Sequence, residues 1–125
     1  MRPSSTHATG VYIDVDGVER MVRFDLFSSQ THLEAWISSL SPAAPTPGVR
    51  AASWHDDEAE PGRPTVWIVL CRDHLQPSIV AHECVHAMQM LGVTGVEPQA
   101  NCVEDLLREA LLWLDEVGAV AQEAG

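Results

Sequence analysis

Apolar and polar residues broadly alternate along residues 11–27, around the pair Asp16-Gly17. Alternation with a period of two is typical of a strand with one buried face. An Asp-Gly pair is favoured in a tight two-residue turn because both turn positions need a positive φ. The pattern therefore predicts a β-hairpin. Its simplest register places Asp14 opposite Glu19, a like-charge pair, so a bulge or a shifted register is the alternative.

The next periodic stretch, residues 31–40, has apolar residues at helical spacing and predicts a short helix that packs on the sheet. Ser29 or Thr31 is its expected N-cap. Residues 41–48 contain three prolines and predict a loop, because proline lacks the N–H donor and fixes φ. A short strand is expected over residues 49–54.

Two stretches in the second half of the chain predict a buried strand followed by a helix. The continuous apolar run 65–71 is typical of a buried strand. A helix is expected over residues 78–91, with Pro77 in its first turn, where a missing N–H is harmless, and Gly92 as its C-terminal stop.

The last predicted helix runs from Cys102 to about Val117, with Asn101 as its cap, after a loop over residues 92–101. Together these elements predict an α+β fold. We expect a small antiparallel sheet, made of the hairpin and the strand 65–71, with the helices packed on it and the last two helices on one face. Residues 1–9 are predicted to be a flexible arm and residues 10–120 a single domain.

Composition limits the classes of partner and the cellular compartment that we expect for the protein. The net charge is −11 and the pI is about 4.7, which argues against a nucleic-acid partner because phosphate contacts need clustered cations. There are three cysteines and no C-x-x-C pair, and the first residues lack the apolar core of a signal peptide. No apolar run is long enough to span a membrane. A cytoplasmic location is expected.

The chemically most informative stretch is His82-Glu83-Cys84-Val85-His86, within the helix predicted over residues 78–91. On a helix, His82 and His86 lie one turn apart with Cβ atoms about 5–6 Å apart, so both imidazoles can reach one metal ion. Glu83 lies at the rim of that face and can act as a general base without ligating the metal. The H-E-x-x-H pattern therefore predicts a zinc site. The alternative is a core helix whose histidines make ordinary hydrogen bonds.

A catalytic zinc ion commonly takes three protein ligands and leaves a fourth position for water. No histidine follows His86, which excludes the metzincin pattern, in which a third histidine comes shortly after the motif. A carboxylate on the final helix is therefore the expected third ligand. Glu109 and Glu104 both flank the apolar stripe of that helix, so periodicity does not choose between them. Asp105 and Glu97 are further candidates.

A His-Glu-x-x-His helix followed by a loop and a helix with a glutamate resembles the gluzincin metallopeptidases in a very short version. Residues 65–117 are similar to small phage-encoded proteins that have an apolar strand and a helix with a motif like 81–86. In those proteins a second helix has Glu-Ala followed by aromatic and aliphatic residues, as in residues 109–114 here. The chain departs from the family in carrying Trp113 near the position that often holds tyrosine, and in its compact loop between the helices.

The resemblance implies a zincin-like core of the minigluzincin type with one zinc ion. Carried over position by position, it implies these roles: His82 and His86 as zinc ligands, Glu83 as the base and Glu109 as the third ligand.

Two further roles need side chains outside the motif. Imidazoles that bind a metal usually donate their other N–H to a carboxylate or carbonyl, and Asp105 or Glu104 can do this if Glu109 is the ligand. A peptidase also needs a donor for the developing oxyanion. His74, just before the motif helix, is slightly preferred for this role over the other available types, which are His55, Tyr12 and Arg108.

The predicted function is a zinc-dependent hydrolase of the peptidase type, in which Glu83 activates a zinc-bound water for attack on a peptide or amide bond. The predicted cofactor is Zn²⁺ and the expected partner is a peptide or protein substrate. If the strand 65–71 lies at the edge of the sheet, it would align the substrate through main-chain hydrogen bonds. The short chain leaves little room for a deep specificity pocket, so a protein partner or a second copy of the chain could complete the cleft.

The alternative function is a non-catalytic phage-type accessory or binding protein with a structural zinc site. A small domain with a thin core gains much stability from a structural metal. Such a site would be closed by a fourth protein ligand, whereas a catalytic site stays open.

Overall fold

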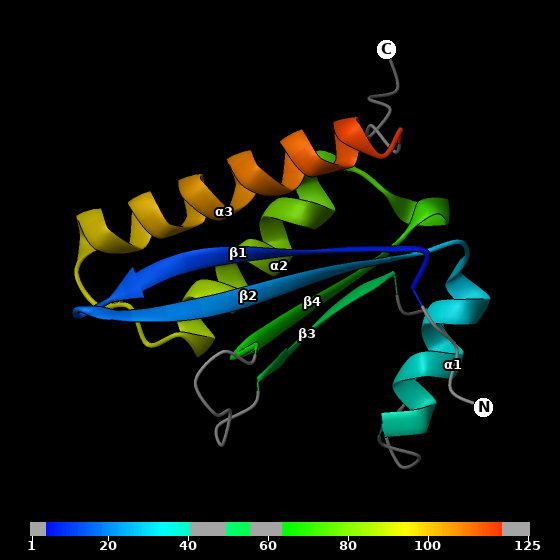
Figure 1. The fold of residues 1–125 in the computed structure, drawn as a ribbon, viewed down its shortest axis with the longest axis horizontal. Helices are drawn as coiled ribbons and strands as arrows, with labels where there is room; N and C mark the ends of the chain where they lie inside the picture. The colour runs from blue at the N-terminus through cyan, green and yellow to red at the C-terminus, as the bar shows by residue number, and fades with distance from the viewer. Residues whose placement is uncertain (1–4, 41–49, 56–63, 119–125) are drawn as a thin grey trace.

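The computed structural model describes residues 5–40, 50–55 and 64–118, which form a four-stranded sheet with helices on both faces (Figure 1). In chain order the elements are β1 (His7–Val15), β2 (Val18–Phe27), α1 (Gln30–Leu40), β3 (Ala51–His55), β4 (Val66–Cys71), the 3₁₀ turn η1 (Arg72–His74), α2 (Pro77–Met90) and α3 (Val96–Glu116). The strand order is β1-β2-β4-β3. The expected α+β class, with helices packed on a small sheet, is confirmed.

β1 and β2 form the predicted hairpin in its simplest register. Asp16 (φ 53°) and Gly17 (φ 82°) occupy the turn, and the Asp14 carboxylate accepts a hydrogen bond of 2.8 Å from the Gly17 amide. Asp14 pairs with Glu19, so the register is not shifted. Both of these carboxylates are exposed, and the like-charge penalty is therefore small.

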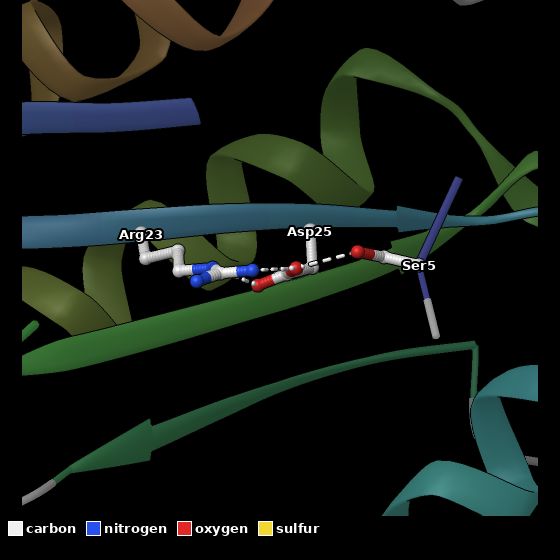
Figure 2. Close-up of polar contacts among 3 residues, drawn as sticks. All are labelled: Ser5, Arg23 and Asp25. Atoms are coloured by element: carbon white, nitrogen blue, oxygen red, sulfur yellow. Dashed lines mark hydrogen bonds and ion pairs between the residues drawn. The ribbon is translucent and has the colours of Figure 1, made fainter. Parts of the chain in front are cut away.

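The first strand begins within the predicted N-terminal arm. Residues 7–9 pair with β2, and Ser5 Oγ donates a hydrogen bond of 2.7 Å to Asp25 Oδ1. Arg23 donates to the same carboxylate from Nε at 3.0 Å and from Nη2 at 3.1 Å (Figure 2). Asp25 is only 3% exposed, and a buried carboxylate needs such donors. The start of the described chain is thus tied to the sheet by a polar contact that apolar patterning does not reveal.

The sheet is mixed, not antiparallel throughout as expected. β4 pairs with β2 in parallel and with β3 antiparallel, so β4 is an interior strand. The segment between β2 and β4, which includes α1 and β3, provides the long crossover that a parallel pair requires. An edge position for the strand 65–71 is therefore wrong, and its near-continuous burial is the physical reason. The edge strand on this side of the described sheet is β3.

Two hydrophobic clusters lie on the two faces of the sheet. One face is covered by α2 and α3, as expected for the last two helices, and the other by α1. α1 begins one residue before its predicted start, and Ser29 Oγ accepts a hydrogen bond of 3.2 Å from the His32 amide, which confirms Ser29 as its cap. In Figure 1, α3 runs along β1, and α2 lies behind the sheet, packed on β4 and β3.

The predicted loop over residues 92–101 is wrong in its second half, because α3 begins at Val96. Pro98 occupies the first turn of α3, where a backbone N–H would have no intrahelical acceptor, so proline is tolerated there. Asn101 therefore lies inside the helix, and Gly95, with φ of 93°, precedes the helix instead. Among the described residues, no helix is both long enough and apolar enough to cross a membrane.

Candidate metal centre

Helix α2 carries the whole H-E-x-x-H motif. It begins at Pro77, whose ring fits the first helical position, and it ends at Met90 before Gly92, which has a positive φ of 74°. The core-facing side of the helix contains Val80 and Cys84, which are fully buried. This packing fixes α2 against the sheet and turns the motif histidines away from the core.

His82 and His86 converge on one side of α2. Their Nε2 atoms are 3.0 Å apart and their rings meet edge to face, with centroids 4.6 Å apart. Both side chains are exposed. Two nitrogen ligands of one tetrahedral zinc ion, each about 2.0–2.1 Å from the metal, lie roughly 3.3 Å apart. The spacing of the two imidazoles is close to that of two positions in the coordination sphere of a zinc ion, and in this structure the two rings are joined by a hydrogen bond.

Glu83 lies between α2 and the edge strand. Its side chain is only 6% exposed, and its Oε1 atom accepts a hydrogen bond of 2.6 Å from Ser53 Oγ on β3. The Ser53 hydroxyl also lies 3.4 Å from the Glu83 main-chain carbonyl. A carboxylate with this degree of burial needs a donor, and Ser53 supplies it.

A cleft opens between the first half of α2 and the start of β3. Its volume is about 390 Å³. The residues that line it are Arg50, Ala51, Ser78, Ile79, His82 and Glu83. One metal-ligand candidate and the candidate base therefore face the same space, which is large enough for part of a peptide.

Among the residues that the structure describes, no third metal ligand joins the two histidines. Within residues 5–40, 50–55 and 64–118, no three His, Cys, Asp or Glu side chains form a group that could hold a metal ion. Glu109 is exposed on α3, one turn after Asp105. Asp105 lines a separate hollow of about 270 Å³ beside residues 12–14 of β1, whereas α2 covers β4 and β3. The assignment of Glu109 as a zinc ligand therefore stays a prediction.

The other acidic candidates lie on the exposed parts of α3. Glu104 and Asp105 both face Arg108, at 3.7 Å and 2.8 Å. Exposed pairs of this kind contribute little to stability, and both carboxylates already have a local partner. Glu97 is exposed in the first turn of α3.

The candidate oxyanion donors are spread over the molecule. His74 Nε2 lies 2.7 Å from Gln30 Oε1 on α1, the helix that covers the opposite face of the sheet from α2. Tyr12 is 61% exposed on β1, and His55 ends β3. None of these three lines the cleft beside Glu83.

All three cysteines are buried. Burial is the main cause that raises the pKa of Cys84 to about 12, and the neighbouring Cys102 and Glu83 contribute to the same rise. The Cys84 thiol is therefore protonated at neutral pH and is unsuited to act as a nucleophile.

Two residues of the site, Arg50 and Ser53, were missed by the sequence reasoning. Ser53 contacts a residue that is 30 positions away in the chain. Alternation along β3 would have placed Ser53 on the same face as Ala51, but only the pairing of β3 with β4 shows that this face is the one covered by α2. The sequence also has an acidic stretch over residues 55–62, and all of it except His55 lies outside the described residues.

Comparisons with protein-family models, with curated proteins and with solved structures found no match for this chain. The resemblance to the gluzincins thus has no support beyond the motif itself, and the functional argument depends on the geometry of α2 and β3.

Proposed function

We propose that this protein is a zinc-dependent hydrolase of the peptidase type. The observation that supports the proposal is the convergence of the His82 and His86 Nε2 atoms at 3.0 Å on the helix that presents Glu83 to the adjoining cleft. Each imidazole can donate a nitrogen lone pair to one ion, and nitrogen ligands suit zinc. Glu109 is the proposed third ligand.

When bound, a zinc ion supplies Lewis-acid chemistry, which acidifies water and polarises a carbonyl group. Glu83 is the proposed general base. Its Oε1 atom accepts the Ser53 hydrogen bond, which holds the carboxylate in one orientation and leaves Oε2 to take a proton from water. The same carboxyl group can then pass that proton to the leaving amine.

The substrate we propose is an extended peptide or amide that lies along β3. Within the described sheet, β3 pairs only with β4, so its other edge has main-chain groups available for a further strand. β3 carries Ser53, and the cleft begins at its first residues, which places the candidate base beside that edge.

The alternative, a structural zinc site in a non-catalytic protein, has less support from the geometry. A structural zinc site is closed by four protein ligands. Within the described residues, His82 and His86 are not joined by further ligand side chains, and both histidines are exposed. A measured stoichiometry of one zinc with four protein donors would favour this alternative.

The test uses Glu83→Gln beside the wild-type protein. We expect about one zinc per chain in both proteins by elemental analysis, because Glu83 is not a ligand. Hydrolysis of a mixed peptide pool, followed by mass spectrometry, should fall by a factor of roughly 10² to 10⁴ in the variant, the usual effect of losing a general base. Equal hydrolysis by the two zinc-loaded proteins would refute the role of Glu83.

A further inference from the structure

Arg50 lines the cleft between α2 and β3. Of the described residues that line this cleft, Arg50 is the only arginine. Its main chain is anchored, because the Cys71 thiol donates a hydrogen bond of 3.4 Å to its carbonyl oxygen. Its side chain is exposed, and no carboxylate among the described residues forms an ion pair with it.

Two of the other described arginines, Arg23 and Arg108, are already used within the fold. Arg23 is held by Asp25 and lies over the Trp67 ring at 4.8 Å, and Arg108 faces two carboxylates of its own helix. Within the described residues the guanidinium of Arg50 has no carboxylate partner, so it is available to a ligand in the cleft. In a protein whose net charge is −11, a bound anion needs such a local cation.

The distance from Arg50 to the candidate base follows from the strand. Arg50 immediately precedes β3, and Ser53, which contacts Glu83, is three residues further on. At about 3.3 Å per residue this is roughly 10 Å. An extended peptide along β3 has the same rise, so a group held by Arg50 lies within about three residues of the bond beside Glu83.

We infer that the cleft selects substrates that carry a carboxylate within about three residues of the bond to be cleaved, and that Arg50 binds this carboxylate. A guanidinium recognises a carboxylate through two parallel charge-assisted hydrogen bonds. The carboxylate can be the C-terminus of a peptide or the side chain of an aspartate or glutamate. This inference rests on the proposed function, because it assigns the substrate class of the same cleft.

The experiment measures peptide retention by equilibrium dialysis against zinc-loaded Glu83→Gln protein, which does not consume its ligand under the proposed mechanism. Three pools of N-acetylated tripeptides are compared: free acids with uncharged side chains, the corresponding C-terminal amides, and amides that contain one aspartate. We expect the free acids, the aspartate amides or both to be retained about fivefold to tenfold more strongly than the uncharged amides. The pool that is preferred identifies the source of the carboxylate.

The matched variants are Arg50→Gln and Arg72→Gln, each made in the Glu83→Gln protein. Both remove one positive charge, but Arg72 is exposed on η1 and does not line the cleft. The preference should disappear with Arg50→Gln and persist with Arg72→Gln. A preference that survives Arg50→Gln, an equal loss in both variants, or no preference for carboxylates in the first place would overturn the inference.

This inference can fail separately from the proposed function. Hydrolysis by the wild-type protein without a carboxylate preference would leave the hydrolase standing and remove the role of Arg50. An Arg50-dependent carboxylate preference without any hydrolysis would support the binding site and remove the proposed catalysis.

Discussion

The hydroxyl of Ser53 donates a hydrogen bond of 2.6 Å to Oε1 of Glu83, and so joins the edge strand to the helix of the candidate metal centre. Ser53→Ala removes the donor and leaves a carboxylate that is only 6% exposed. We expect the free energy of unfolding to fall by about 1–3 kcal/mol, the usual effect of leaving a buried polar group unsatisfied. Urea denaturation measures it. Ser78→Ala, which changes an exposed serine of the same cleft, is the control and should have little effect.

The same pair predicts an effect on catalysis. Ser53→Thr keeps a hydroxyl on β3 and should retain most of the hydrolytic activity, whereas Ser53→Ala should lower turnover at an unchanged zinc content. The reason is that an unheld carboxylate samples orientations from which it cannot take the proton. Identical turnover in the alanine variant and the wild type would show that the hydrogen bond is structural only.

The contacts of Asp25 with Ser5 and Arg23 should contribute to the free energy of unfolding. Asp25→Asn keeps an acceptor oxygen but removes the charge that Arg23 and Ser5 contact in Figure 2. We expect a loss of about 1–3 kcal/mol in the free energy of unfolding, because hydrogen bonds to a charged group are stronger than neutral ones. Thermal denaturation of Asp25→Asn beside Asp115→Asn, an exposed aspartate of α3, checks it. Equal melting temperatures in the two variants would contradict it.

The buried thiol of Cys71 should make the protein less stable in alkaline solution. The pKa of its thiol lies above the ordinary value of 9.0, mainly because the side chain is buried. The Asp73 carboxylate also raises this pKa, whereas backbone hydrogen bonds with His74 and Asp73 lower it in part. Above pH 9 the unfolded chain therefore releases this proton more readily than the folded chain, and the unfolding free energy falls as pH rises. Cys71→Ala should be less stable at pH 7 but show a shallower decline above pH 9. Parallel declines in both proteins would contradict the assignment.

Local signals explain which parts of the fold could be predicted. The hairpin register follows from Asp16-Gly17, because few other residues accept the two positive φ values. The start of α1 follows from Ser29, which caps it. The predicted start of α3 at Cys102 was wrong, because the helix begins at Val96 and includes Pro98 in its first turn, where a proline is tolerated.

Long-range contacts explain the rest. The continuous apolar run of β4 agrees with its interior position, but the crossover that places β3 at the edge leaves no local trace in the pattern. Of the candidate site, the spacing of His82 and His86 could be predicted, since it is a property of one helix. Ser53 and Arg50 could not, because they reach Glu83 and its cleft only through the packing of β3 on α2.

The two histidines predict a metal-dependent gain in stability. At a zinc concentration one hundred times the dissociation constant, zinc should raise the unfolding free energy of the wild type by about 2.7 kcal/mol, because it binds the folded chain. His86→Ala should abolish this gain, and a chelator should reverse it in the wild type. His7→Ala, which removes an exposed histidine of β1, is the control. A gain that is the same in all three proteins would place the metal elsewhere.

Glu109 and Glu104 differ in whether binding zinc would break an existing ion pair. Glu104 faces Arg108 at 3.7 Å, whereas no contact within the described residues holds the exposed Glu109 carboxylate. We therefore expect Glu109→Gln to weaken zinc binding by roughly tenfold or more, and Glu104→Gln to leave it within about twofold. Competition with a zinc-sensitive dye measures both affinities. The reverse ranking would assign Glu104, and two unchanged affinities would remove both glutamates from the coordination sphere.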